Sequence, residues 1–282
     1  MNICKKNLIP ADLKEVEHLL SIASTYPWIE KRLDEYEELR SFCETEEQKD
    51  LIHEMIKNFT YLSISDMKKE ILNIVNYIEE KGCTPEDTIF YAFSDDRESD
   101  SSQAFLYYMK TIFPTEKGWK GENFCGNIVK IKEHDEKYKN VFLVDDFSGS
   151  AQKVKSKYNF ATKEIQNLEH NCSIEVILLA AMNKAEEIIG NRNIPYFSVM
   201  TLKRGLSDNY TDEELKIQSD IMLQLEQKLK HTPQCRYFPF GKDKCEALFY
   251  IDEFNIPNNV FPIFWWEKTL HGIRNTMFTR KN

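Results

Sequence analysis

The sequence lacks the glycine-rich motifs of two large nucleotide-binding classes. No G-x-G-x-x-G occurs in the 282 residues, which disfavours a dinucleotide-binding dehydrogenase, and no G-x-x-x-x-G-K-[ST] occurs, which disfavours an ATP-hydrolysing P-loop. The 9 glycines and 9 prolines are scattered, without an internal repeat or a linker-like stretch. The chain is therefore expected to be globular, with a function that depends on some other motif.

Disulfide frameworks, zinc knuckles and membrane spans are also missing. The 7 cysteines are odd in number and none forms a C-x-x-C pair, which argues against disulfides and a zinc knuckle. The longest apolar run, residues 176–182, is far shorter than the roughly 18 residues of a spanning helix. Residues 1–20 lack the apolar core of a signal peptide. We therefore expect a soluble, cytoplasmic protein with no membrane partner.

Basic residues are outnumbered by acidic residues. The 37 lysines and arginines against 46 aspartates and glutamates give a net charge of −9. Proteins that bind nucleic acid over a broad surface are usually basic, so no general nucleic-acid binding is expected. A local basic pocket for a phosphate is compatible with this charge.

The first part of the chain has helical hydrophobic spacing. Between residues 11 and 81, apolar residues recur at intervals of three and four, as at Ile71, Ile74, Val75 and Ile78. Gly82 follows, where a glycine commonly ends a helix. The pattern predicts an all-helical N-terminal subdomain over residues 1–85 and a second domain over residues 86–282.

After Gly82 the pattern changes to short apolar runs separated by helical stretches. This alternation is typical of an α/β fold with a doubly wound, mainly parallel sheet. A strand near residues 247–251 and an aromatic C-terminal extension follow. The predicted strands are residues 88–93, 126–131, 141–146, 174–182 and 196–202, and the predicted helices are residues 103–113, 152–169, 185–189 and 212–230.

The segment after the strand at residues 141–146 combines acids with a small-residue loop. Asp145 and Asp146 end the apolar run, and Ser-Gly-Ser at residues 148–150 leads into a predicted helix. Ligands of parallel sheets bind beyond the carboxyl ends of the strands. Loop amides and a helix N-terminus suit a phosphate, and carboxylates suit ribose hydroxyls or Mg²⁺. The alternative interpretation is a turn whose acids cap the helix.

The sequence VFLVDDFSGSAQK, residues 141–153, resembles the phosphoribosyl-diphosphate loop of type I phosphoribosyltransferases. Together with NIPNNVFPIFWW, residues 255–266, it resembles a bacterial branch whose members are predicted effectors of conflict (anti-phage) systems. The resemblance covers residues 88–202 and this C-terminal element. It implies the phosphoribosyltransferase fold and binding of phosphoribosyl diphosphate or a nucleotide with Mg²⁺. It also implies transferase activity of the glycosyltransferase class and a protein partner in a defence module.

The resemblance assigns roles by position. Asp145 and Asp146 would bind the ribose hydroxyls as catalytic residues and would contact Mg²⁺. The 5-phosphate would be held by Ser148, Gly149, Ser150, Ala151, Gln152 and Lys153. The diphosphate-loop candidates are Ser94, Asp95, Asp96 and Arg97, of which Arg97 is the only cation. A nucleobase would stack on, or the tail would be fixed by, Asn258, Asn259 and Trp265.

Two residues depart from the pattern of that family. Ala151 stands where the loop usually has glycine, and its Cβ would hinder a positive φ. Lys153 stands where a threonine usually contacts the phosphate. These departures favour binding of a ribose phosphate over its transfer, and they leave open a non-catalytic interaction protein on a degenerate fold. A receiver-like signalling domain is disfavoured, because Asn183 and Lys203, not aspartates, follow the later strands.

Overall fold

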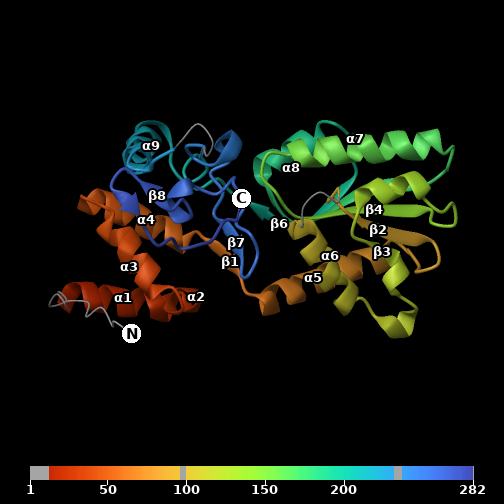
Figure 1. The fold of residues 1–282 in the computed structure, drawn as a ribbon, viewed down its shortest axis with the longest axis horizontal. Coiled ribbons are helices and arrows are strands. Elements are labelled where there is room, and N and C mark those ends of the chain that lie inside the picture. The colour runs from red at the N-terminus through yellow and green to blue at the C-terminus, as the bar shows by residue number, and fades with distance from the viewer. Residues whose placement is uncertain (1–12, 96–99, 232–236, 282) are drawn as a thin grey trace.

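A computed structural model describes residues 13–95, 100–231 and 237–281. At its centre lies a five-stranded sheet with the order β3-β2-β4-β5-β6, in which all neighbouring strands are parallel (Figure 1). The strands are β2 (Thr88–Ala92), β3 (Phe124–Cys125), β4 (Asn140–Ser148), β5 (Ser173–Met182) and β6 (Tyr196–Leu202).

Helices cover both faces of this sheet. In Figure 1, α5 (Ile64–Glu80) and α6 (Ser101–Ile112) lie on one face, and α7 (Gln152–Asn167) and α8 (Asn183–Gly190) lie on the other. Residues 141–144 of the central strand β4 are almost fully buried, as expected of a continuously apolar strand between two helical layers. The predicted α/β class with a doubly wound parallel sheet is confirmed.

The predicted helices are present, with ends set by local caps. The helix predicted from residue 103 begins at Ser101, because the Asp100 carboxylate accepts a hydrogen bond from the Ser102 amide at 2.9 Å. The helix predicted to residue 169 ends at Asn167, and Glu169 has a positive φ of 58° that cannot continue it. The long helix predicted at residues 212–230 is α9 (Asp212–Gln227).

The prediction of a strand at residues 126–131 is wrong. This segment forms the 3₁₀ helix η3 (Ile128–Glu133), and the edge strand is the shorter β3 before it. The Asn127 side chain accepts a hydrogen bond from the Val129 amide at 2.7 Å. Such local bonds compete with strand pairing. Ile128 and Ile131 are buried at a helical spacing of three, a pattern too short to distinguish from a strand in the sequence.

The N-terminal region is mainly helical but not entirely so. Its helices before the first strand are α1 (Leu13–Thr25), α2 (Pro27–Glu30), α3 (Leu33–Ser41) and α4 (Glu46–Lys57). A strand that was not predicted, β1 (Thr60–Leu62), follows α4 and pairs in parallel with β7 (Phe249–Ile251). The strand predicted near residues 247–251 is thus present, and its partner is β1 rather than the central sheet.

Aromatic side chains fill the junction between the two ends of the chain. Trp28 stacks on Tyr61 with ring centroids 4.9 Å apart, and Phe59 contacts Phe278 at 4.9 Å. Arg32 of the helical region forms an ion pair with Asp252 at 3.1 Å. The C-terminal extension, which also carries the hairpin β8 (Lys268–Thr269) and β9 (Gly272–Ile273), therefore packs against the N-terminal helices. Within the described ranges, no helix has the length and apolarity needed to cross a membrane.

Candidate functional site

Two adjacent carboxylates lie at the carboxyl end of the central strand β4. Asp145 is 2% exposed and Asp146 is 4% exposed. Successive side chains of a strand point to opposite faces of the sheet. Accordingly, Asp145 reaches Lys153 on α7, whereas Asp146 accepts a hydrogen bond from Ser101 on α6. The acid pair thus connects β4 to a helix on each face.

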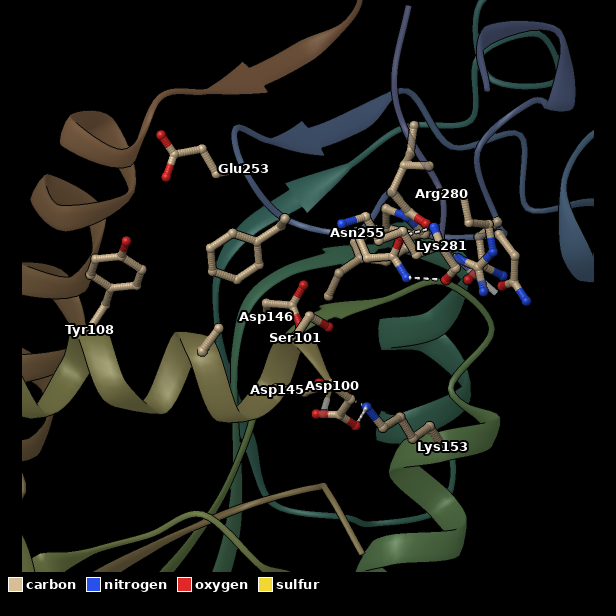
Figure 2. A pocket seen from close by; sticks show the side chains of 17 residues that line it. Asp100, Ser101, Tyr108, Asp145, Asp146, Lys153, Glu253, Asn255, Arg280 and Lys281 are labelled. Atoms are coloured by element: carbon tan, nitrogen blue, oxygen red, sulfur yellow. Dashed lines mark hydrogen bonds and ion pairs between the residues drawn. The ribbon is translucent and has the colours of Figure 1, made fainter. Parts of the chain in front are cut away.

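The acid pair opens into a cavity of about 640 Å³. Three regions of the chain build its wall: the start of α6, the end of β4 with the start of α7, and the C-terminal extension (Figure 2). The polar and aromatic side chains of this wall include Asp100, Ser101, Tyr108, Asp145, Asp146, Lys153, Glu253, Phe254, Asn255, Asn258, Asn259, Arg280 and Lys281.

The ionic groups of this cavity are electrostatically linked. Burial raises the pKa of Asp145, and the nearby Lys153 ammonium partly offsets that rise. Burial likewise raises the pKa of Asp146. Burial would also raise the pKa of Asp100, but the Lys153 charge and the hydrogen bonds from Ser102 outweigh it, so this pKa is lowered. Of the described residues that line this cavity, the carboxylates Asp100, Asp145, Asp146 and Glu253 outnumber the cations Lys153, Arg280 and Lys281.

The predicted small-residue loop does join β4 to α7. Ser148 ends the strand and is buried, and Ala151 adopts φ 59° directly before the first residue of the helix, Gln152. The sequence predicted that the Ala151 Cβ would hinder a positive φ. The loop imposes that conformation nevertheless, at a cost of about 1–2 kcal/mol for a residue with a Cβ.

Gly149 lies directly beneath the Asn259 side chain. A Cβ built on Gly149 would overlap the Asn259 carboxamide, so this position requires glycine. The Asn259 amide nitrogen donates hydrogen bonds to the Lys242 carbonyl oxygen at 3.0 Å and to the Cys245 Sγ at 3.2 Å. The C-terminal Asn-Asn element thus packs on the loop that follows the acid pair.

A second, smaller cavity of about 220 Å³ borders this loop. Three of its lining residues come from the loop and helix start: Gly149, Ser150 and Gln152. Its cations are Lys155, Lys184 and Arg204. Arg204 is paired with Asp208 at 2.7 Å. The two cavities share no lining residue.

The sequence model of the PRTase-CE family matches residues 35–279. The chain belongs to the PRTase-CE family. This PRTase-CE protein is accordingly phosphoribosyltransferase-like, as the sequence resemblance implied. The match begins within α3 and extends over α4, α5, the central sheet and most of the C-terminal extension. No curated protein matches the chain.

Solved structures show a weaker likeness. Orotate phosphoribosyltransferase from Aeropyrum pernix is 10% identical, with 49% of this chain and 71% of that chain covered, and a TM-score of 0.30. Adenine phosphoribosyltransferase from Thermoanaerobacter pseudethanolicus is 10% identical, with 49% and 81% covered, and a TM-score of 0.31. A hypothetical protein from Neisseria gonorrhoeae with bound ppGpp is 14% identical, with 58% and 96% covered, and a TM-score of 0.32. At such scores, the fold of the PRTase-CE chain rests on its own strand order.

Not all predicted site residues of the PRTase-CE chain meet at the acid pair. Trp265 is buried outside the large cavity and donates its indole N–H to the Val260 carbonyl oxygen at 3.0 Å. Ser94 is buried, and its carbonyl oxygen accepts from the Ile128 amide at 2.9 Å. Asp95 pairs with Lys157 at 3.6 Å. The predicted Asp96 and Arg97 lie outside the described residues.

Sequence reasoning missed the aromatic and basic parts of the large cavity. Tyr108 on α6 lines it and stacks against Phe254 with ring centroids 6.3 Å apart. Arg280 and Lys281 reach it from the end of the chain. The Asn255 side chain exchanges two hydrogen bonds with the Lys281 backbone, at 2.8 and 2.7 Å, which holds the tail there. No local pattern in the sequence indicates that residues 280 and 281 reach this cavity.

Proposed function

We propose that this protein binds the ribose 5-phosphate part of phosphoribosyl diphosphate or of a nucleotide. The observation that carries the proposal is the order of groups at the end of β4: two buried carboxylates, a loop containing glycine, and the N-terminus of α7. A carboxylate accepts hydrogen bonds from ribose hydroxyls, and amides at a helix N-terminus stabilise a phosphate.

In this proposal, the two cavities bind different parts of the ligand. Asp145 and Asp146 accept the ribose hydroxyls in the large cavity, where the Tyr108 and Phe254 rings offer flat apolar surface for a base. The 5-phosphate binds the loop face, close to Lys155 and Lys184. Asn259 covers Gly149 between these positions, so its side chain would contact the ligand's phosphate.

Mg²⁺ enters this proposal as part of the ligand. The residues described bring together no three histidine, cysteine, aspartate or glutamate side chains that could hold a metal ion. Mg²⁺ is usually bound through one or two carboxylates together with substrate phosphates and waters. The diphosphate oxygens of phosphoribosyl diphosphate would therefore supply most of its ligands, with Asp145 or Asp146 at its edge.

Transfer of the phosphoribosyl group would need little protein chemistry beyond positioning and charge stabilisation at the ribose C1. A role as an effector or sensor in a bacterial defence system, with a protein partner and a cytoplasmic location, is a further part of the proposal. It is supported by the sequence resemblance of residues 141–153 and 255–266.

Thermal unfolding with ribose 5-phosphate, and separately with phosphoribosyl diphosphate plus Mg²⁺, tests the binding proposal. A ligand at about 100 times its dissociation constant should add about 2.7 kcal/mol to the free energy of unfolding. Asp145→Asn combined with Asp146→Asn should abolish that increase. Asp220→Asn, which changes an exposed acid on α9, is the matched control. Stabilisation that survives in the double variant would contradict the proposal.

A non-catalytic interaction protein is the second candidate. The observation in its favour is the Asn259 side chain, which fills the space above Gly149 that a phosphate would approach. A copurifying protein partner, together with the lack of a thermal shift with either ligand in both the native chain and Asn259→Ala, would support this candidate over ligand binding.

A further inference from the structure

Lys153 occupies the centre of the acidic end of the large cavity. Its Nζ lies 3.1 Å from Asp145 Oδ1 and 3.1 Å from Asp100 Oδ2 (Figure 2). The three residues come from the first turn of α7, the end of β4 and the N-cap of α6. The ammonium also lies 5.7 Å from the centre of the Phe93 ring, at the end of β2. It thus bridges elements on both faces of the sheet.

This contact differs from the one expected for a phosphate loop. The sequence places Lys153 among the residues that would hold the 5-phosphate. In the structure its side chain turns away from the loop and lines the acid-pair cavity, whereas Gln152 beside it lines the smaller cavity. The Lys153 charge is therefore directed at the carboxylates.

The ammonium performs the electrostatic task of a bound cation. Among the residues that the structure describes, Lys153 is the cation that pairs with Asp145 and Asp100, and carboxylates gathered in a buried site are costly without an opposite charge. The Lys153 Nζ lies 3.1 Å from a carboxylate oxygen of each of Asp145 and Asp100, so one ammonium pairs with two carboxylates.

The same arrangement does not fit a resident Mg²⁺. Asp145 and Asp146 are directed to different partners, Lys153 and Ser101. Mg²⁺ demands near-ideal octahedral oxygen coordination at about 2.0–2.1 Å. A metal between Asp145 and Asp100 would have to take the position that the Lys153 Nζ already holds.

We propose that the Lys153 ammonium replaces a divalent cation at the acid pair, so that a ribose phosphate without a diphosphate binds independently of Mg²⁺. The inference rests on the proposed function and specifies its cation. It assigns Lys153 as a residue that positions Asp145 toward the ribose hydroxyls. Mg²⁺ then matters only for a ligand that carries its own diphosphate.

Calorimetric titration with ribose 5-phosphate, in a chelator and in Mg²⁺, tests this inference. The native chain should bind with the same affinity in both. Lys153→Met should bind about tenfold more weakly in the chelator, equivalent to about 1.4 kcal/mol, and should regain affinity in Mg²⁺. Lys153→Arg, which keeps the charge, should retain binding in the chelator. Lys163→Met, at an exposed position of the same helix, is the control and should match the native chain.

The outcomes separate the inference from the function on which it rests. Binding by the native chain in Mg²⁺ but not in the chelator would overturn the role of Lys153 and leave the ribose-phosphate site standing. Lack of binding under both conditions would contradict the proposed function itself. Because the comparison of chelator with Mg²⁺ uses the native chain, it holds even if Lys153→Met does not fold.

Discussion

The cavity at the acid pair and the smaller cavity that borders the loop at residues 148–151 differ in charge. The larger one contains the buried carboxylates Asp145 and Asp146, with Lys153 bound to the first of them. The smaller one has Lys155, Lys184 and Arg204 against the loop and contains one acid, Asp243. A ribose 5-phosphate has the complementary asymmetry, with hydroxyl donors at one end and a dianion at the other.

This difference in charge shows that one short segment can combine carboxylates with groups that favour an anion. Strand β4 carries the two acids near its end, and after a short loop the chain enters the first turn of α7, where amides and basic side chains favour an anion. Asn259, packed on Gly149, lies at the boundary between the two environments. The comparison can be tested by changing one cavity at a time.

The largest expected effect is a loss of binding affinity that differs between two ligands, depending on which cavity is changed. Asp145→Asn with Asp146→Asn should weaken ribose 5-phosphate binding by about a hundredfold or more, because each hydrogen bond to a charged group contributes about 1.5–3 kcal/mol. It should leave inorganic phosphate unaffected. Lys155→Gln with Lys184→Gln should weaken both ligands, more so at low salt. Calorimetry of the four combinations measures this, and equal losses of both ligands in the acid variant would show a single undivided site.

Gly149→Ala should destabilise the protein by disrupting the contact between the loop and Asn259. Its methyl group would overlap Asn259, and overpacking of this kind typically costs about 1–3 kcal/mol. Urea unfolding measures the loss. Gly190→Ala is the control, since a Cβ there meets nothing within 4 Å. A double-mutant cycle with Asn259→Ala should recover part of the loss, and strictly additive effects would show that Asn259 is not the obstacle.

Lys153→Met should lower the stability of the folded protein by an amount that depends on pH. Without the ammonium, the pKa of buried Asp145 rises further above the value of about 3.9 for an unfolded chain. The folded state then holds a proton that the unfolded state releases, so stability falls as the pH rises above that value. The difference from the native chain should be small at acid pH and reach about 1–3 kcal/mol at neutral pH. A pH-independent difference in urea unfolding would contradict this account.

Ala151→Gly should give the smallest effect and of opposite sign. The residue has φ 59°, a conformation that glycine adopts without strain. Against this gain, glycine gives the unfolded chain more conformational freedom, which lowers stability by about 0.5–1 kcal/mol. We expect a net stabilisation of up to about 1 kcal/mol in urea unfolding. A loss of stability would show that the buried Ala151 Cβ contributes more by packing than it costs in strain.

The central sheet could be predicted from sequence because its determinants are local. The runs at residues 141–144 and 176–182 are continuously apolar, and helical spacing between them defines the crossovers. The acid pair and its loop were predictable for the same reason, because they follow a buried strand directly. The strand predicted at residues 126–131 failed because Asn127 initiates a local turn that periodicity does not detect.

The rest of the site depends on contacts between distant residues. Tyr108 and Phe254 belong to segments far apart in the chain, and nothing in either segment indicates the other. The direction of the Lys153 side chain depends on Asp100, which precedes another helix. Trp265 is fixed by the backbone of its own segment, a contact that composition does not distinguish from a ligand-binding role.

The pairing of β1 with β7 has a consequence for biosynthesis. Thr60 aligns with Phe249, so β1 can form this pair only after residue 249 has left the ribosome. Synthesis proceeds at about 5–20 residues per second, and contacts between such distant segments slow folding. During that interval the Thr60–Leu62 edge and the Phe59 and Tyr61 rings remain exposed to chaperones and to other nascent chains. Strand β7 thus completes a pair whose other strand was synthesised long before it.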